Sequence, residues 1–150
     1  MRYITDCIVT MFYIGRIPFA PGSWASLVAV ILWLNFFKNL NYLFLPIIAL
    51  TLFFIGTYFS HLVLRTTDTK DPSFIVIDEW VGQWIAFSFL PVNYTIAILG
   101  FLLFRFFDIS KVGPVKSFEK LPGAWGVMAD DVIAGILSMM TLLLIQYYIL

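Results

Sequence analysis

The sequence predicts an all-α, polytopic membrane protein, and two observations carry this prediction. Apolar residues make up 61% of the 150 residues and charged residues only 12%, against about 45–50% and about 25% in an ordinary soluble domain. The apolar residues also gather in long runs that short polar breaks separate. Because a water-facing surface cannot be built from so few charges, soluble, disordered and fibrous classes are excluded. We expect one membrane-embedded domain over residues 1–150.

About four to five membrane-embedded helices are predicted along the chain. Crossing about 30 Å of hydrocarbon takes about 20 helical residues. Two runs meet this length, residues 43–64 and 128–150, and three are shorter, residues 24–37, 74–90 and 94–107. The shorter runs either cross by tilting or by thinning the bilayer, or stop part way.

A short N-terminal interfacial helix is predicted within residues 1–16. On such a helix Ile4, Ile8, Met11 and Phe12 share one face, which suits a helix lying in the membrane interface. A frayed terminus that packs on the bundle explains the same pattern equally well. The sequence favours neither alternative.

The basic residues predict the orientation of the chain. Threading the runs alternately through the membrane places eight of the nine Lys and Arg residues on one side, and only Lys38 on the other. The positive-inside rule assigns the basic side to the cytoplasm. The eight residues are Arg2, Arg16, Arg65, Lys70, Arg105, Lys111, Lys116 and Lys120. The net charge is zero, so no overall field attracts nucleic acid.

Five carboxylates lie at the predicted cytoplasmic ends of these helices: Asp78, Glu79, Asp108, Asp130 and Asp131. A charge at mid-bilayer costs roughly 2.5–3.5 kcal/mol, and a bound divalent cation would offset much of that cost. Oxygen ligands without a His or Cys cluster suit Mg²⁺ or Mn²⁺. Alternatively, acids at helix N-termini are favourable caps, but Asp108 closes a helix, where negative charge is disfavoured. We favour a metal site for the set; for any single residue both interpretations stay open.

Two glycines are spaced to bring the acidic turns together. Gly82 follows Asp78 by one helical turn, and Gly135 follows Asp131 by one turn. Small residues allow helices to approach closely. The pattern therefore predicts close packing of the two helices beside their acids.

The same face carries cations that suit phosphate. Arg105, Asp108 and Lys111 recur every three residues, so a continued helix presents them on one stripe. Arg binds phosphate oxygens in a bidentate manner and Lys acts as a point charge. The alternative is that these cations snorkel to the membrane edge. We prefer that alternative for Lys116 and Lys120, but not for Arg105.

The loop over residues 18–23 leads into an apolar helix. Free N–H groups at a helix start favour an anion, and the hydroxyls of Ser23 and Ser26 add donors. With Arg16 on the same face, these residues are candidates for substrate phosphate binding. As an ordinary N-cap, however, Ser23 needs no ligand. The single histidine, His61, is more typical of a packed side chain than of a catalytic one.

Three blocks of this chain resemble the phosphatidylglycerophosphatase A family. They are residues 15–27 (GRIPFAPGSWASL), residues 75–82 (IVIDEWVG), and residues 104–108 (FRFFD) together with 128–135 (MADDVIAG). Two positions depart from the family pattern. Residues 111–114 read KVGP where the family often has Lys-Pro-aromatic-Pro, and Ala25 stands where glycine is frequent. Neither departure removes a residue that the resemblance implies to be a ligand.

The resemblance implies a Mg²⁺-dependent lipid phosphatase of the bacterial inner membrane, multi-pass, with its active site facing the cytoplasm. Its substrate would be the phospholipid phosphatidylglycerophosphate, which loses its terminal phosphate to leave phosphatidylglycerol. By position, the catalytic and metal-binding acids would be Asp78, Glu79, Asp108, Asp130 and Asp131, and Arg105 matches the motif arginine. The nucleophile is either a metal-activated water with Glu79 as base or an aspartate that forms a phosphoenzyme.

Two other function classes remain as alternatives. A CDP-alcohol phosphotransferase would also use intramembrane acids and Mg²⁺, but it needs a longer Asp-rich motif on consecutive helical turns, which this sequence lacks. A small cation-coupled transport subunit would place acids along a path through the bilayer, whereas these acids gather at one side. The oligomeric state is not predicted.

Overall fold

The protein is described by a computed structural model that covers residues 2–40, 43–69 and 71–149. These residues form seven α-helices and one 3₁₀ helix, with no strand among them, so the all-α prediction is confirmed. The helices are α1 (Arg2–Val9), η1 (Ile14–Arg16), α2 (Pro21–Phe36), α3 (Phe44–Leu64), α4 (Ile77–Ala86), α5 (Tyr94–Ser110), α6 (Val115–Phe118) and α7 (Ala124–Tyr148). Lys70 and Leu150, which belong to the predicted basic face and the last predicted helix, lie outside the described residues.

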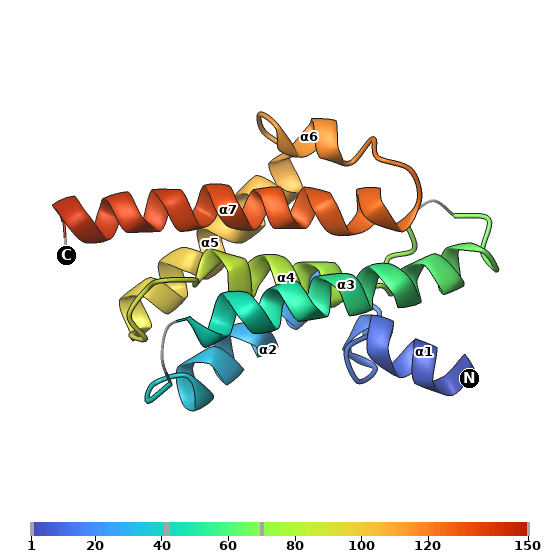
Figure 1. Ribbon diagram of the computed structural model, residues 1–150, viewed down its shortest axis with the longest axis horizontal. Helices are drawn as coiled ribbons and strands as arrows, with labels where there is room; N and C mark the ends of the chain where they lie inside the picture. Colours follow the sequence, from blue (N-terminus) through green and yellow to red (C-terminus); the bar gives the residue numbers. More distant parts are fainter. Residues whose placement is uncertain (1, 41–42, 70, 150) are drawn as a thin grey trace.

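The short helix α4 forms the centre of the molecule. It packs against α2, α3, α5 and α7, and Figure 1 shows it between α3 and the long α7. Most of its residues are buried, including both tryptophans and Gln83. Because α4 begins with Asp78 and Glu79, burying this helix also carries two carboxylates into the interior.

Two of the described helices, α3 and α7, are long and apolar enough to cross a membrane, with mean hydropathies of 2.0 and 1.8. This finding is consistent with a membrane protein. The helices α2, α4 and α5 have 16, 10 and 17 residues, and whether they cross depends on the bilayer around them. The count of four to five membrane-embedded helices therefore stays a prediction.

The N-terminal helix is shorter than the sequence pattern indicated. It ends at Val9, and Met11 and Phe12 adopt left-handed φ angles of 45° and 57°. As a result Met11 is buried while Phe12 is exposed, so the predicted common face reaching Phe12 is wrong. The hydroxyl of Thr10 accepts a hydrogen bond from the backbone N–H of Tyr13 at 2.9 Å, and such local bonds compete with helix continuation.

The helix α2 begins at Pro21, before the position that the sequence suggested. Proline suits the first position of a helix because its missing N–H would be unpaired there anyway. Ala20 is the N-cap residue, with φ 47°, and Ser23 lies inside the first turn. The interpretation of Ser23 as the N-cap is therefore wrong.

The predicted close packing at the two glycines is confirmed. A Cβ atom on Gly135 would lie 2.4 Å from the carbonyl oxygen of Gly82, and one on Gly82 would lie 2.6 Å from the carbonyl oxygen of Asp131. Any larger residue would push α4 and α7 apart at this point. The contact fixes the acidic turn of α4 beside that of α7.

Candidate active site

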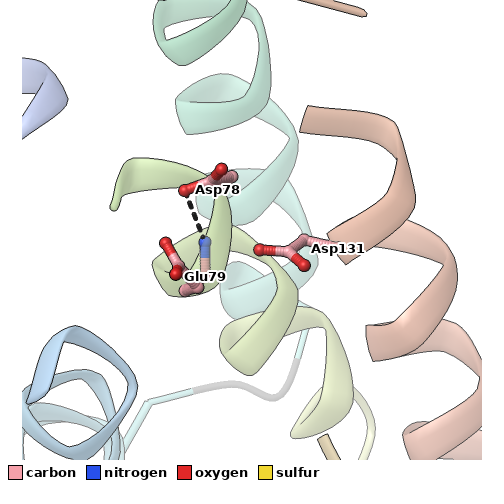
Figure 2. A group of neighbouring side chains, drawn as sticks. All are labelled: Asp78, Glu79 and Asp131. Carbon is pink, nitrogen blue, oxygen red and sulfur yellow. Dashed lines mark hydrogen bonds between the residues drawn. The ribbon is translucent and has the colours of Figure 1, made fainter. Parts of the chain in front are cut away.

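Three carboxylates from two helices converge at the cavity described below. Asp78 and Glu79 lie in the first turn of α4, and Asp131 lies in α7. One oxygen from each lies within 4.8 Å of the other two, and Figure 2 shows Asp131 facing the pair on α4. Asp78 and Asp131 are buried. Like charges this close repel each other strongly unless a cation neutralises them.

The backbone around the trio fixes its geometry. The backbone N–H of Glu79 donates to Oδ1 of Asp78 at 3.0 Å. The Glu79 side chain reaches the first turn of α2, where a Cβ on Gly22 would lie 1.8 Å from its Oε1. A larger residue at Gly22 would displace the Glu79 carboxylate from its present position. Among the described residues, the buried Oε2 of Glu79 has no hydrogen-bond partner.

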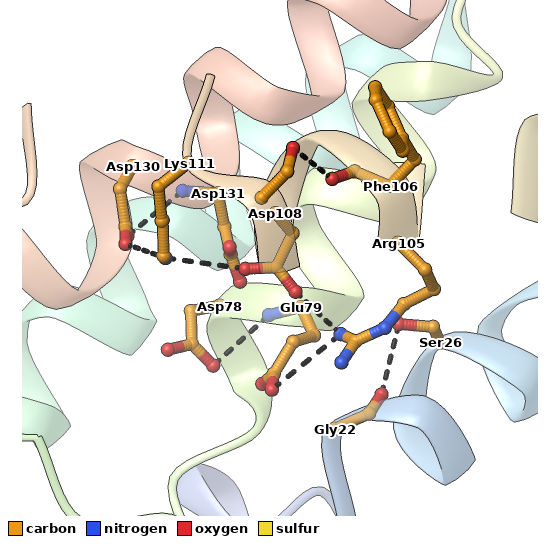
Figure 3. Close-up of polar contacts among 11 residues, drawn as sticks. Gly22, Ser26, Asp78, Glu79, Arg105, Phe106, Asp108, Lys111, Asp130 and Asp131 are labelled. Atoms are coloured by element: carbon orange, nitrogen blue, oxygen red, sulfur yellow. Dashed lines mark hydrogen bonds and ion pairs between the residues drawn. The ribbon is translucent and has the colours of Figure 1, made fainter. Parts of the chain in front are cut away.

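The other two predicted acids are paired with cations. Oδ2 of Asp108 lies 2.7 Å from Nη1 of Arg105, and Oδ1 lies 3.3 Å from Nζ of Lys111. Lys111 also forms an ion pair with Asp130, whose Oδ1 accepts from the backbone N–H of Asp131 at 3.0 Å. Figure 3 shows this network beside the trio. The five acids thus divide into three grouped together, of which Glu79 also lies 3.9 Å from Nη1 of Arg105, and two that cations hold more closely.

Lys111 ends α5 in the left-handed conformation, with φ 49°. Burial alone would lower the pKa of its ammonium group, but the hydrogen bond to Asp130 and the charges of Asp131, Asp130 and Asp108 outweigh it and raise the pKa above its ordinary value. Lys111 is therefore fully charged at neutral pH and holds Asp108 and Asp130 in place.

These groups line a cavity of about 340 Å³. Six carboxylates and two cations face it: Asp71, Asp78, Glu79, Asp108, Asp130, Asp131, Arg105 and Lys111. The charged side chains alone leave the cavity strongly negative, so it does not attract a phosphate dianion without a further cation. Seven of the ten predicted site residues lie on this cavity.

The other three predicted residues, Arg16, Ser23 and Ser26, are not among the residues that line the cavity. Arg16 forms an ion pair with Asp6, and its guanidinium lies 4.6 Å from the centre of the Phe74 ring. Ser26 is buried, and its hydroxyl donates to the carbonyl oxygen of Gly22 at 2.9 Å. Both side chains are thus engaged within the protein.

Two residues that contribute to the site were not predicted, Asp71 and Gly22. Asp71 lies on the rim of the cavity, in the loop before α4. Partial desolvation raises the pKa of its carboxyl group, Lys111 opposes this, and Glu119 and Asp108 add to it. No local pattern distinguishes Asp71 from the nearby Asp68. Gly22 belongs to the loop that the sequence predicted over residues 18–23. Its contact with Glu79 could not be predicted, because it depends on how α2 packs against α4.

The arrangement has the donor set of a hard-cation site. The trio offers three carboxylates within reach of one ion, and Oε2 of Glu79 is a buried oxygen that lacks a partner in the described part of the chain. Such an oxygen is costly unless a ligand satisfies it. Arg105 contributes a buried Nε that has no hydrogen-bond partner among these residues either. These features fit Mg²⁺ together with an oxyanion.

Comparison with known proteins gives a consistent result. A protein of Bacteroides thetaiotaomicron named "Putative phosphatidylinositol-3-phosphatase" is 37% identical, over 98% of this chain and 96% of its own length. Proteins named "Phosphatidylglycerophosphatase A" from Haemophilus influenzae and Escherichia coli are 36% and 32% identical, over 91% and 83% of this chain and 85% and 73% of their own lengths. No solved structure gives a significant match.

The family profile described as Phosphatidylglycerophosphatase A matches residues 7–146. This range includes every residue that lines the cavity of the site. The chain therefore belongs to the phosphatidylglycerophosphatase A family, a family of phosphatases.

Proposed function

We propose that this protein hydrolyses the terminal phosphate monoester of phosphatidylglycerophosphate, giving phosphatidylglycerol and inorganic phosphate in bacterial glycerophospholipid synthesis. Two kinds of evidence support the proposal: the names of the family and of two relatives, and the geometry of the site. One observation carries it: six carboxylates face two cations around a cavity large enough for a phosphate group. Such an excess of negative charge suits a cation-dependent reaction of an anionic substrate.

Asp78, Glu79 and Asp131 would hold Mg²⁺, because one oxygen from each lies within 4.8 Å of the other two, and the ion pair of Glu79 with Arg105, at 3.9 Å, is longer than those of Asp108. Bound there, Mg²⁺ would supply charge neutralisation and Lewis-acid polarisation of the phosphate. Arg105 would bind non-bridging phosphate oxygens through its unpartnered Nε, while Asp108 fixes the guanidinium. Phosphate monoester hydrolysis is among the slowest uncatalysed reactions, so positioning and electrostatics together are required.

Two nucleophiles are compatible with this arrangement. Glu79 would act as base toward a water, or one of the paired aspartates, Asp108 or Asp130, would attack phosphorus and form an acyl phosphate. Rapid acid quenching during turnover of ³²P-labelled substrate distinguishes them. Label retained on the protein and released by hydroxylamine supports the aspartate, and unlabelled protein supports water.

We also propose that the site faces the cytoplasm of the inner membrane, with α3 and α7 crossing the bilayer and the shorter helices embedded beside them. The distribution of Lys and Arg supports this orientation. In a Cys7→Ser background, Lys116→Cys and Lys38→Cys report opposite sides. In intact cells an impermeant thiol reagent should label only Lys38→Cys, and labelling of Lys116→Cys instead would reverse the orientation.

Phosphate release from the lipid in detergent micelles tests the function directly. We expect turnover with Mg²⁺, loss of at least about 100-fold with a chelator, and recovery when Mg²⁺ is restored. Turnover that survives exhaustive chelation would overturn the cation requirement. No phosphate release under any of these conditions would overturn the lipid phosphatase assignment.

Phosphatidylinositol 3-phosphate is a second candidate substrate, because the relative from Bacteroides thetaiotaomicron that bears such a name covers nearly the whole chain. Both lipids carry a phosphate monoester on a polyol that a phosphodiester joins to the lipid. Assays with the two lipids at equal surface concentration decide between them through the ratio of kcat/KM.

A further inference from the structure

The cavity of the candidate active site adjoins a larger one. A second cavity of about 770 Å³ shares Asp71, Val127 and Asp130 with it. This second cavity, called the vestibule below, lies between the loop after α3, the segment around α6, and the start of α7. Figure 1 places α6 and its flanking loops beside the start of α7. A molecule whose phosphate occupies the acidic cavity therefore has room for its remainder in the vestibule.

The vestibule offers charged groups of both signs. Lys116 and Lys120 line it together with Asp68 and Glu119. Among the described residues, the ammonium group of neither lysine forms an ion pair or a hydrogen bond, whereas that of Lys111 pairs with Asp108 and Asp130. Free ammonium groups suit a phosphodiester, and neighbouring carboxylates accept hydrogen bonds from hydroxyl groups. This combination matches a hydroxylated bridge between two phosphates.

The vestibule also adjoins an apolar groove. A third cavity, of about 610 Å³, shares Pro122 and Gly123 with the vestibule and runs between α3 and the start of α7. Its aromatic walls, Phe54, Tyr58 and Trp125, are all about half exposed. The groove thus lies between the two described helices that are long enough to cross a membrane. Aromatic and apolar walls at that place suit a hydrocarbon chain.

We propose that the lipid substrate lies along these adjoining cavities, with its diester phosphate at Lys116 and Lys120 in the vestibule and one acyl chain in the groove between α3 and α7. The proposal rests on the proposed function, since it places the rest of a lipid whose terminal phosphate occupies the acidic cavity. It gives Lys116 and Lys120 a binding role in place of simple snorkelling. It also predicts that the lipid enters sideways from the bilayer, between α3 and α7.

The lysines are tested by steady-state kinetics of the double variant Lys116→Gln/Lys120→Gln with phosphatidylglycerophosphate. We expect KM to rise about tenfold, since two partly exposed ion pairs are lost, with kcat within about threefold. The control is Lys38→Gln, which removes a cation at the other end of the molecule. An unchanged KM in the double variant, or a fall in kcat alone, overturns the role of the vestibule.

The groove is tested by photolabelling with a phosphatidylglycerophosphate that carries a diazirine at mid-chain. We expect labelled residues on the facing surfaces of α3 and α7, and at least threefold less label in Tyr58→Ser than in Tyr94→Ser, which removes an exposed tyrosine outside the groove. Equal labelling of the exposed stripe of α5, including Ile98 and Leu102, overturns the groove. Absence of phosphate release by the wild-type protein would instead reject the proposed function, so the two failures are distinguishable.

Discussion

The two ends of α4 differ in what packs around them: carboxylates gather at its start and aromatic rings at its end. At its start, which we call the acidic end, Asp78 and Glu79 face Asp131, and Arg105 reaches this group only through an ion pair of 3.9 Å with Glu79. At its finish, the aromatic end, the Phe87 ring stacks on Trp33 with centroids 4.0 Å apart and planes 10° apart. Figure 1 shows α4 lying between α3 and α7, and most of its residues are buried.

Contacts at the aromatic end hold α4 against its neighbours, whereas repulsion among the carboxylates at the acidic end destabilises the packing of the helix. The indole N–H of Trp84 donates to the carbonyl oxygen of Ala29 at 3.0 Å, which ties α4 to α2. Buried aromatic pairs add about 0.5–1.5 kcal/mol beyond their apolar burial. Repulsion among three carboxylates acts in the other direction. We infer that packing at one end keeps the carboxylates at the other end close enough to share an ion.

The largest expected effect on activity comes from Asp131→Asn. The change removes one ligand charge while keeping the side-chain shape, and kcat should fall about 10³-fold. Because it also relieves repulsion, the Mg²⁺-free protein should melt at the same temperature as the wild type or higher. Phosphate release and thermal unfolding in detergent measure the two quantities. Asp6→Asn is the control. Wild-type turnover in Asp131→Asn would show that Asp131 does not belong to the site.

Arg105→Lys should have the next largest effect. Lysine keeps the charge but loses the forked guanidinium, which pairs with Asp108 and which we propose also binds a phosphate oxygen. We expect kcat to fall about 100-fold with little change in the Mg²⁺ concentration needed for half-maximal activity. The matched control is Arg65→Lys at the end of α3. A shift mainly in the Mg²⁺ requirement would assign Arg105 to the metal site rather than to the phosphate.

A pair of glycine substitutions compares the two ends directly. Alanine at Gly82 would place Cβ 2.5 Å from the Phe104 ring, and alanine at Gly100 would place it 2.3 Å from the Phe87 ring. Both should lower stability by about 1–3 kcal/mol through overpacking. Only Gly82→Ala separates the carboxylates, so it alone should reduce kcat by about 10- to 100-fold. Equal losses of activity in the two variants would contradict the division between the ends.

The smallest expected effect on activity comes from Phe87→Leu. Loss of the buried ring should lower the free energy of unfolding by about 1–3 kcal/mol. Turnover measured well below the melting temperature should stay within about twofold of the wild type. The exposed Phe36→Leu provides the baseline for both measurements. A large loss of activity in the folded Phe87→Leu protein would show that the aromatic end does more than anchor α4.

The sequence by itself determined the all-α class, the family, and the bounds of the helices α2, α3, α4, α5 and α7 to within four residues, but not the early end of α1 or the presence of α6. Helix-forming apolar runs, paired acids and spaced glycines are local patterns, so they are visible without tertiary structure. The contact between Gly82 and Gly135 followed from the same reasoning, because on each helix a glycine follows an acid by one turn.

The tertiary structure decided which of these residues act together. It divided the five acids into the trio of Asp78, Glu79 and Asp131 and the pair that Arg105 and Lys111 hold. It also engaged Arg16 with Asp6 and brought Asp71 to the rim. The pairs of Asp108 with Arg105 and Lys111 lie on one helical stripe that the spacing predicted, whereas the pair of Lys111 with Asp130 depends on how α5 and α7 pack. Residues far apart in the chain meet at distances that no local pattern encodes.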